Sequence, residues 1–393
     1  MHHKGEEKMH QTSEEKEEIN LLSKSAAEFC RKEIADHYAT WEKQGNIPRD
    51  LWNKLGNQGF LLPEVPEEYG GLGTTFLYST TIIETFSRLG YNSIAANLSV
   101  HDTIIAQYLL NYGTEKQKKH YLPKMATGEL IGAIAMTEPA AGSDLQGIKT
   151  IAKYDRKQAA YQLNGSKTFI TNGQHCDFVV VVAKTNLDVK PSRGITLFIV
   201  DVPVAGFERG TNLDKIGLHS CDTSELYFED VLVTEAAILG EKDQGFKILM
   251  SELPRERLIV ANNAVASMEG IIEQTVQYVK ERELFGTTLA SFQNTQFVLA
   301  EVATKARVQR SFANECTNLL VKGELDTVTA SMAKLSCTEV QGEVIDHCLQ
   351  LFGGYGYMTE YPIARAYADA RVQRIYGGSS EVMKLIIGKN LLL

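Results

Sequence analysis

The spacing of apolar residues changes twice along the chain, and this change limits the possible folds most. From residue 14 to about 123, apolar side chains such as Ile19, Leu22 and Ala26 recur at helical intervals between charged ones. From Gly132 to about residue 228 the pattern is that of strands, and from Gly245 the helical period returns. The chain is therefore expected to be an α+β protein in which a β domain separates two helical domains.

The first helical part contains several predicted helices and one rigid loop. Helices are expected over residues 14–38, around Trp52, over 80–88 and 94–111, and before Pro123. Residues 63–73, Pro-Glu-Val-Pro-Glu-Glu-Tyr-Gly-Gly-Leu-Gly, contain too much proline and glycine for a helix and predict a tight loop.

The middle part predicts strands over residues 161–163, 168–171, 178–182, 195–200 and 224–228, with a turn at Asn164-Gly165. Long helices are expected over residues 258–282, 293–322 and 327–351. A chain of 393 residues is too long for one compact core. We therefore expect an N-terminal α-helical domain over residues 1–131, a β domain over 132–241 and a C-terminal α-helical domain over 242–393.

Charge and composition exclude several classes of function. A net charge of -9 argues against a nucleic-acid partner, which would need clustered Lys and Arg. The six cysteines show no Cys-x-x-Cys spacing and are expected to be buried thiols, and the pair His2 and His3 is expected in a solvated tail; no metal site is predicted. The chain has no apolar run that could span a bilayer and no signal or transit pattern. A cytoplasmic protein is expected, or a mitochondrial matrix protein if this is a mature eukaryotic form.

Common catalytic motifs are absent from the sequence. There is no Gly-x-Gly-x-x-Gly after a strand, no Gly-x-Ser-x-Gly and no His-Glu-x-x-His. The segment Gly165-Ser166-Lys167-Thr168 lacks the upstream glycine of a phosphate-binding loop and is interpreted as a hairpin turn. Hydrolases and nucleoside triphosphatases are therefore disfavoured.

A small-residue loop in the middle part is a better candidate for a cofactor site. An apolar strand begins at Gly132 and is interrupted at Pro139, and Thr137, Gly142 and Ser143 lie on either side of this break. Glycine and serine allow a ligand to approach the backbone closely. An ordinary turn is the alternative.

Five separated motifs resemble those of the acyl-CoA dehydrogenase family. They are Met-Thr-Glu-Pro-Ala-Ala-Gly-Ser-Asp at 136–144, Phe-Ile-Thr-Asn-Gly at 169–173, Lys-Glu-Arg-Glu-Leu-Phe-Gly at 280–286 with Gln293, Leu-Gln-Leu-Phe-Gly-Gly-Tyr-Gly-Tyr at 349–357, and Ile-Tyr-Gly-Gly-Ser-Ser-Glu at 375–381. The resemblance covers essentially the whole chain. Residues 132–150, Leu-Pro-Arg-Glu-Arg-Leu at 253–258 and the Tyr-Gly-Gly ending look most like the long-chain branch of the family.

This resemblance implies a helical N-terminal domain, a β-barrel-like middle domain and a C-terminal four-helix bundle, assembled as a homotetramer with one FAD per subunit. It implies that the flavin ring and the pantetheine are contacted by Met136, Thr137, Gly142, Ser143, Phe169 and Thr171. It implies that the adenine and pyrophosphate, partly across a subunit interface, are held by Arg282, Phe285, Gln293, Gln350, Gly353 and Gly354. Ser379 and Glu381 are expected near FAD as well, and Ser143, Arg257 and Gly378 near the substrate.

The catalytic base departs from the majority pattern of the resembled family. Most relatives carry a Glu in Tyr-Glu-Gly, whereas this chain has Gly377 there, which cannot take a proton. The long-chain and isovaleryl branches carry the base on a helix, in a Glu-Arg-Leu segment that Glu256 matches here. Glu256 is thus the expected base, and the Gly377 N–H is expected to donate to the thioester oxygen. The alternative places Glu256 on a solvated helix face with Glu252 and Glu269.

The expected function is FAD-dependent dehydrogenation of a medium- or long-chain acyl-CoA to the trans-2-enoyl-CoA in fatty acid β-oxidation, with electrons passed to an electron-transfer flavoprotein. An isovaleryl or other branched-chain dehydrogenase, an acyl-CoA oxidase and a non-catalytic acyl-CoA-binding relative are the alternatives. Chain-length preference would depend on a pocket between helices that involves residues 94–107.

Overall fold

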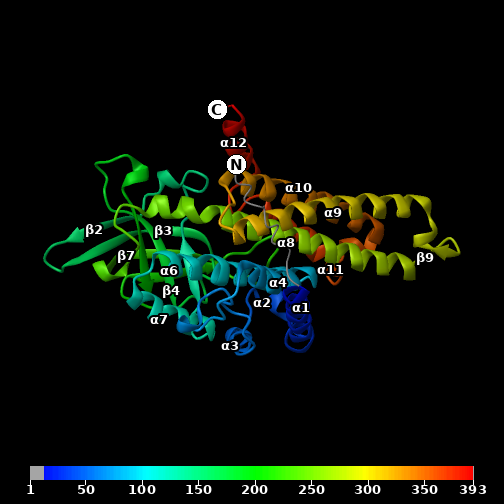
Figure 1. Ribbon diagram of the computed structural model, residues 1–393, viewed down its shortest axis with the longest axis horizontal. Helices are drawn as coiled ribbons and strands as arrows, with labels where there is room; N and C mark the ends of the chain where they lie inside the picture. The colour runs from blue at the N-terminus through cyan, green and yellow to red at the C-terminus, as the bar shows by residue number, and fades with distance from the viewer. Residues whose placement is uncertain (1–12, 393) are drawn as a thin grey trace, which may run out of the picture.

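The computed structural model describes residues 13–392, so His2 and His3 lie outside the described residues. A β-sheet occupies one end of the molecule, long helices extend from it to the other end, and shorter helices cover one side (Figure 1). The expected order of helical, β and helical segments is confirmed.

Seven α-helices form the N-terminal part of the chain from residue 13 onward. They are α1 (Ser13–Glu33), α2 (Tyr38–Gln44), α3 (Arg49–Asn57), α4 (Phe76–Arg88), α5 (Asn92–Leu98), α6 (Ala106–Tyr112) and α7 (Glu115–Ala126). Thr114 begins α7 with a capping box, in which its hydroxyl and the Gln117 side chain each accept from the other residue's backbone N–H. The expected loop at residues 63–73 is present, with one 3₁₀ turn, η1 (Glu67–Tyr69), inside it.

The helix expected over residues 94–111 is continuous but not uniform. Its central part, η2 (Ser99–Ile105), is a π-helix between α5 and α6. Single widened turns of this kind occur frequently at functional sites. The Arg255 side chain of the long helix α8 (Gly245–Glu281) donates to the carbonyl of Thr103 in this segment at 3.1 Å, which ties η2 to α8.

The middle part is a single sheet of eight strands, β1 (Gly132–Ala135), β2 (Ile151–Asp155), β3 (Ala160–Thr171), β4 (Phe178–Lys184), β5 (Ile195–Asp201), β6 (Phe207–Asn212), β7 (Thr223–Thr234) and β8 (Ile238–Leu239). Seven of them follow the order β6-β7-β3-β2-β4-β5-β8, and β1 pairs with β4 in parallel. Because β6 and β8 end the order without pairing to each other, the described sheet does not close into the expected barrel.

The turn expected at Asn164-Gly165 is wrong, as is the hairpin expected at residues 165–168. Both segments lie inside the twelve-residue strand β3, and the register with β7 shifts between Leu163 and Gly165. Gly165 has a φ of +154°, and a Cβ there would lie 2.4 Å from the Thr150 hydroxyl oxygen. The glycine is therefore required by a β-bulge and a close contact within the sheet.

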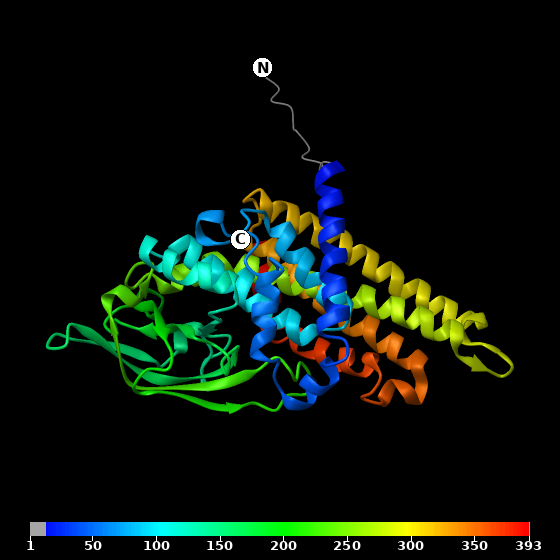
Figure 2. The same cartoon turned by 90° about the horizontal axis from the view of Figure 1, so that it is seen from below.

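Five helices form the C-terminal part: α8, α9 (Gln293–Val321), α10 (Thr327–Phe352), α11 (Pro362–Gln373) and α12 (Ser380–Leu391). Helices α8, α9 and α10 run side by side in both views, and α11 packs on α8 and α10 (Figures 1 and 2). A short hairpin, β9 (Glu283–Leu284) and β10 (Thr287–Thr288), joins α8 to α9 at the end far from the large sheet. Helix α12 begins against α10, where the Ser380 hydroxyl donates to Glu339, and extends away from the bundle in Figure 1.

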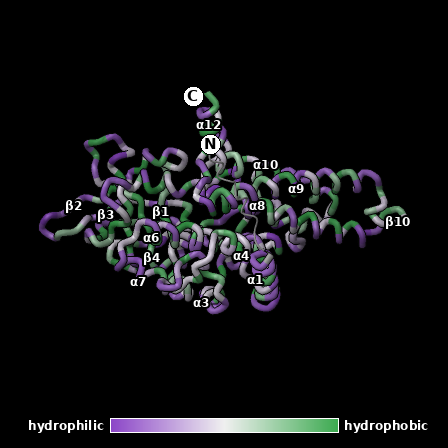
Figure 3. The backbone as a smooth tube through the Cα atoms, in the orientation of Figure 1, coloured by the Kyte–Doolittle hydropathy of each residue, from purple (hydrophilic) through white to green (hydrophobic). Residues whose placement is uncertain are grey.

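The burial pattern agrees with these packing relationships. Purple and green alternate along α8, α9 and α10 in Figure 3, as expected for helices with one buried face. All six cysteines are buried and free, as predicted. Among residues 13–392, no helix is both long and apolar enough to cross a membrane.

Candidate active site

Glu256 lies on the buried side of α8, near the middle of the molecule. Only 7% of its surface is exposed, and the Tyr108 hydroxyl of α6 donates to its Oε1 at 2.8 Å. The solvated-face alternative is therefore wrong for this residue. Glu252, one turn earlier, is also buried and accepts from the Asn111 side chain at 3.1 Å.

Burial sets the acidity of Glu256. Desolvation by burial raises the pKa of this carboxyl to about 7. The hydrogen bond from Tyr108 and the charge of Arg257 lower the pKa, whereas the charge of Glu252 raises it further. A carboxylate with a pKa near neutrality can accept a proton and still be ionised for much of the time at physiological pH.

Gly377 lies in the loop between α11 and α12, next to the turn of α8 that follows Glu256. A Cβ placed on Gly377 would lie 3.7 Å from Cγ2 of Val260, which is one helical turn after Glu256. Gly377 has a φ of +63° and Gly378 a φ of +97°, and within residues 13–392 neither N–H has a hydrogen-bond acceptor. The loop thus presents free amide donors near a buried carboxylate.

Lys334 of α10 holds this loop by a hydrogen bond. This role was not predicted from the sequence. Its Nζ donates to the Gly378 carbonyl at 2.7 Å, and its side chain is fully buried. Burial and the Arg257 charge lower its pKa to about 8. The sequence does indicate that Lys334 is buried, because Lys334 continues the helical spacing of Ala330, Ala333 and Cys337 on the buried face of α10.

Arg257, predicted to contact substrate, is buried beside the same loop. Its guanidinium donates to the Ser331 hydroxyl at 3.3 Å, while its Nε has no partner within the described chain. Burial lowers its pKa, and the Glu256 charge partly restores it. Two cations, Arg257 and Lys334, are therefore buried close to the two glycines.

The loop after β1 is held by a buried ion pair. Lys167 of β3 donates to the Met136 carbonyl at 3.1 Å and to Glu138 at 2.9 Å, and the Glu138 carboxylate also accepts from the Thr150 N–H at 2.9 Å. The Thr168 N–H donates to the Thr137 carbonyl at 2.9 Å. These contacts fix the backbone of Met136 and Thr137, the predicted flavin residues, and Lys167 and Glu138 were not identified from the sequence.

The remaining predicted flavin residues lie on this loop or in the second half of β3. A second register shift in β3, between Lys167 and Ile170, turns the Phe169 side chain outward, where it is 67% exposed at a φ of +59°. Thr171 ends the strand, and Gly142 and Ser143 are exposed on the loop.

The predicted adenine and pyrophosphate residues lie at the far end of the helices. Arg282 and Phe285 follow α8, Gln293 begins α9, and Gln350, Gly353 and Gly354 end α10. All six are exposed, and the Arg282 guanidinium lies over the Tyr355 ring at 5.5 Å, which places the ends of α8 and α10 together. The chain thus brings this second set of residues together.

The two sets are not brought together within one chain. Glu256 and Arg282 are separated by about 39 Å along α8, at 1.5 Å per residue, and the β9–β10 hairpin and the large sheet lie at opposite ends of the molecule (Figures 1 and 3). The predicted adenine residues therefore lie far along α8 from the buried carboxylate of the same chain. Ser379 and Glu381 lie at the start of α12, directly after Gly377 and Gly378, where the Ser379 hydroxyl caps the helix by accepting from Val382 N–H at 3.4 Å.

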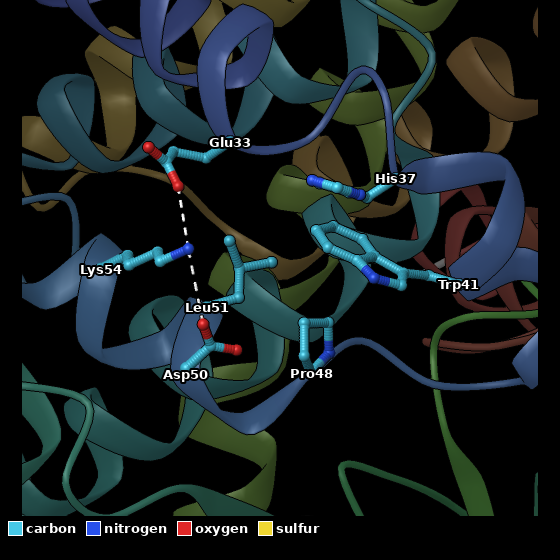
Figure 4. Close-up of a pocket in the computed structure, with 7 residues that line it drawn as sticks. All are labelled: Glu33, His37, Trp41, Pro48, Asp50, Leu51 and Lys54. Atoms are coloured by element: carbon cyan, nitrogen blue, oxygen red, sulfur yellow. Dashed lines mark ion pairs between the residues drawn. The ribbon is translucent and has the colours of Figure 1, made fainter.

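A cavity of about 210 Å³ between α1, α2 and α3 is a different feature (Figure 4). Its charged side chains pair with one another, as Lys54 bridges Glu33 at 2.9 Å and Asp50 at 3.4 Å. It contains none of the residues predicted for catalysis or cofactor binding.

The observed architecture has helical regions before and after a β-sheet in the chain and a buried carboxylate near free amide donors. This arrangement suits an enzyme that removes a proton beside a carbonyl group. Family models for the N-terminal, middle and C-terminal domains of acyl-CoA dehydrogenases match residues 16–129, 133–231 and 243–392. The chain belongs to the acyl-CoA dehydrogenase family, and it is an FAD-dependent oxidoreductase.

Individual relatives are similar along nearly the whole chain. The long-chain specific acyl-CoA dehydrogenase of Sus scrofa is 47% identical over 376 residues, which cover 95% of this chain and 86% of that protein. The structure of an acyl-CoA dehydrogenase from Geobacillus kaustophilus is 46% identical, with a TM-score of 0.93 and coverage of 96% and 98%. An acyl-CoA dehydrogenase complexed with FAD, from Bacillus anthracis, has a TM-score of 0.90 at 31% identity and covers 96% of this chain and 67% of that one.

The residues present fit FAD. A Cβ built at Gly142, Gly353 or Gly354 would meet no atom within 4 Å, so the backbone is open to a ligand at each position. The exposed Arg282 guanidinium has the shape and charge that phosphate oxygens require. Phe285 is 88% exposed, an apolar surface that a ring system or a second subunit would cover.

Proposed function

We propose that this protein dehydrogenates medium- or long-chain acyl-CoA thioesters between the α and β carbons, and that Glu256 is the base that takes the α-proton. The observation that carries this proposal is the burial of Glu256 beside Tyr108, one helical turn from Val260, whose Cγ2 would lie 3.7 Å from a Cβ placed on Gly377. Gly377 leaves the space in front of α8 open, where a side chain at that position would extend.

The roles of the chain's own groups follow from their geometry. The Gly377 N–H, free of any acceptor in the described chain, donates to the thioester oxygen and stabilises the negative charge that develops there. Tyr108 holds Oε1 of Glu256, which leaves Oε2 to receive the α-proton. FAD, when bound, would supply the acceptor for the β-hydride, so that the loss of one proton and one hydride from the substrate would leave a carbon–carbon double bond. Met136, Thr137, Phe169 and Thr171 orient the flavin ring, and Arg257 and Gly378 position the thioester.

The preference for straight medium or long chains is supported by the 47% identity to the long-chain specific enzyme of Sus scrofa. A branched-chain substrate such as isovaleryl-CoA is the second candidate, because the same helix-borne Glu-Arg-Leu segment occurs in that branch. Bleaching of the flavin against a series of straight and branched acyl-CoAs separates the two. Oxygen consumption without an added acceptor would identify an oxidase, and a colourless protein that binds acyl-CoA would identify a non-catalytic relative.

We further propose a homotetramer in which each FAD contacts two subunits, with an electron-transfer flavoprotein as electron acceptor. One set of predicted cofactor residues lies at the large sheet and the other at the far ends of α8 and α10, and this placement supports a shared site. The exposed Phe285 and Arg282 would then meet the cofactor from a neighbouring subunit. Light scattering combined with FAD content tests this, because a monomer that retains one tightly bound FAD contradicts it. A cytoplasmic or, for a mature eukaryotic form, matrix location is part of the same proposal.

Glu256→Gln tests the central assignment. The variant should bind FAD and acyl-CoA, but anaerobic flavin reduction should slow by about 10²- to 10⁴-fold and exchange of the α-proton with solvent should be lost. Glu252→Gln is the matched control, since Glu252 lies one turn away on the same helix, is equally buried and accepts from the Asn111 side chain. Rapid reduction by Glu256→Gln would overturn the assignment.

A further inference from the structure

Two consecutive glycines form the loop that faces α8, and their backbone needs support from outside. Gly377 and Gly378 both have positive φ values, and glycine has the largest conformational freedom of any residue. The loop is anchored on each side by backbone bonds, from Tyr376 N–H to the Val372 carbonyl at 3.1 Å and from Ser380 N–H to the Arg374 carbonyl at 3.1 Å. Between these anchors, only one side-chain hydrogen bond reaches the glycines within residues 13–392.

That single bond comes from Lys334. Its Nζ donates to the Gly378 carbonyl at 2.7 Å, and the charge is fully buried, although no carboxylate within the described residues forms an ion pair with it. Burying a cation without a paired anion costs free energy. Arg257 lies beside it, which increases this cost, while the Glu339 and Glu381 charges act on it more weakly. A cation retained here is therefore better explained by a role at the loop than by stability.

We propose that Lys334 is a positioning residue for the reaction: it holds the Gly377-Gly378 loop so that the Gly377 N–H points at the thioester oxygen. This inference rests on the proposed function. Lys334 is a positioning residue and not a catalytic one, because its buried ammonium group is bonded to the carbonyl of Gly378. Its positive charge, together with that of Arg257, also favours the negative charge that develops on the oxygen when the α-proton leaves.

The role predicts a specific change in ligand recognition. A thioester ligand carries the carbonyl oxygen that the loop would bind, whereas the alkyl-CoA thioether of the same length lacks it. The purified holoenzyme should bind the thioester more tightly than the thioether. Lys334→Met should reduce this preference by about ten- to a hundredfold, as expected for a misplacement of about 1 Å, while binding of the thioether and the visible spectrum of FAD stay unchanged.

The ligand pair used is a 3-thiaacyl-CoA, which can lose its α-proton but cannot be oxidised onward, and the matching alkyl-CoA. Loss of that proton next to FAD gives a long-wavelength absorbance band, which Lys334→Met should weaken. Gln341→Met is the matched control: Gln341 lies two turns further along α10, is buried and has no hydrogen-bond partner among residues 13–392. Gln341→Met should keep both the preference for the thioester over the thioether and the long-wavelength absorbance band.

Two further variants keep the test decisive if Lys334→Met does not fold. Lys334→Gln removes the buried charge and shortens the side chain, and should lose the preference; Lys334→Arg keeps a charged donor and should restore part of it. Wild-type preference in Lys334→Gln, or an equal loss in Gln341→Met, would overturn the proposal for Lys334. A wild-type enzyme that does not distinguish the two ligands would instead overturn the proposed function.

Discussion

Tyr108 on α6 and Glu256 on α8 are joined by a hydrogen bond of 2.8 Å, in which the tyrosine hydroxyl donates to the carboxylate. The two residues come from the N-terminal and C-terminal helical parts, and 148 positions separate them in the chain. The bond stabilises the ionised carboxylate and holds one of its oxygens. The packing of α6 on α8 therefore affects both the position and the acidity of the proposed base.

Removal of this bond should shift the pH dependence of the reaction. In the wild type, kcat/KM should rise as pH increases through about 7, because Glu256 must lose its proton before it can act as a base. In Tyr108→Phe the ionised form loses a donor, so the pKa rises and the acidic limb moves to higher pH. Well below pH 7 the rate should fall by about tenfold for each unit of pKa shift.

Tyr112→Phe provides the control for this measurement. Tyr112 lies one turn further along α6, with its ring 6.5 Å from that of Tyr108, and it makes no hydrogen bond to Glu256. Stopped-flow flavin reduction from pH 5.5 to 9 compares the variants. Superimposable pH profiles for Tyr108→Phe and the wild type would show that the hydroxyl does not tune the base.

Breaking the buried ion pair under the flavin loop should reduce stability and FAD affinity together. Lys167 is fully buried and Glu138 is 5% exposed, so Lys167→Met leaves a carboxylate buried without its cation. We expect a loss of about 3–5 kcal/mol in unfolding free energy, together with weaker FAD binding because the Met136 carbonyl loses its donor.

The double variant Lys167→Met, Glu138→Gln separates these effects. It removes the unpaired charge and should recover part of the stability, but it does not restore the bond to Met136, so FAD should remain weakly bound. Urea unfolding of the apoprotein and titration of FAD by fluorescence measure the two quantities. Full recovery of FAD affinity in the double variant would contradict a role for Lys167 at the loop.

The sequence predicted the elements well where their signal is local. The helical period of residues 327–351 needs only neighbouring residues, and α10 spans Thr327–Phe352 as expected. Asn164-Gly165 has the local signal of a turn, but pairing with β7 and contact with Thr150 make it a bulge inside β3. Such contacts join residues far apart in the chain and leave no local pattern.

The candidate site shows the same limit. Glu256 is predicted to be the base because Gly377 stands where most relatives carry the catalytic glutamate. That prediction depends on comparing two separate motifs. Its partner Tyr108 and the loop-supporting Lys334 belong to no motif and became evident only when α6, α8 and α10 were placed together. The π-turns of η2 likewise could not be distinguished from an ordinary helix by apolar spacing.

Two helical glycines offer a test of packing. In α8 a Cβ on Gly270 would lie 1.8 Å from the backbone carbonyl oxygen of Arg88 at the end of α4, so these helices touch closely at this glycine. Gly270→Ala should lower unfolding free energy by about 1–3 kcal/mol by overpacking. Gly388→Ala in α12, where no atom lies within 4 Å, should be neutral or stabilising by about 1 kcal/mol. Chemical denaturation measures both, and equal effects would contradict the close contact.

A buried carboxylate joins all three parts of the chain and should make stability depend on pH. Asp369 of α11 accepts from the Leu218 N–H, between β6 and β7, at 2.6 Å and from the Asn92 side chain of α5 at 3.1 Å. Burial, and then the Glu42 charge, raise its pKa to about 7. Because Asp369 in the unfolded chain loses its proton near pH 3.8, the folded state binds more protons between these values. Stability from this residue should therefore fall as pH rises from about 4 to 7.

Asp369→Asn should remove this dependence. An asparagine can still accept from the Leu218 N–H, and its amide can donate to the Asn92 Oδ1, which has no partner within residues 13–392, once the Asn92 amide has flipped. The variant should match the wild type near pH 4, exceed it by about 1–2 kcal/mol at pH 5, and exceed it at pH 8 by a few kcal/mol at most, at about 1.4 kcal/mol per unit of pKa shift. Urea unfolding at pH 5, 6.5 and 8 measures the difference. If the difference in unfolding free energy between the variant and the wild type stays constant across this range, the Asp369 carboxyl is already ionised at pH 5. Burial then does not raise its pKa as proposed.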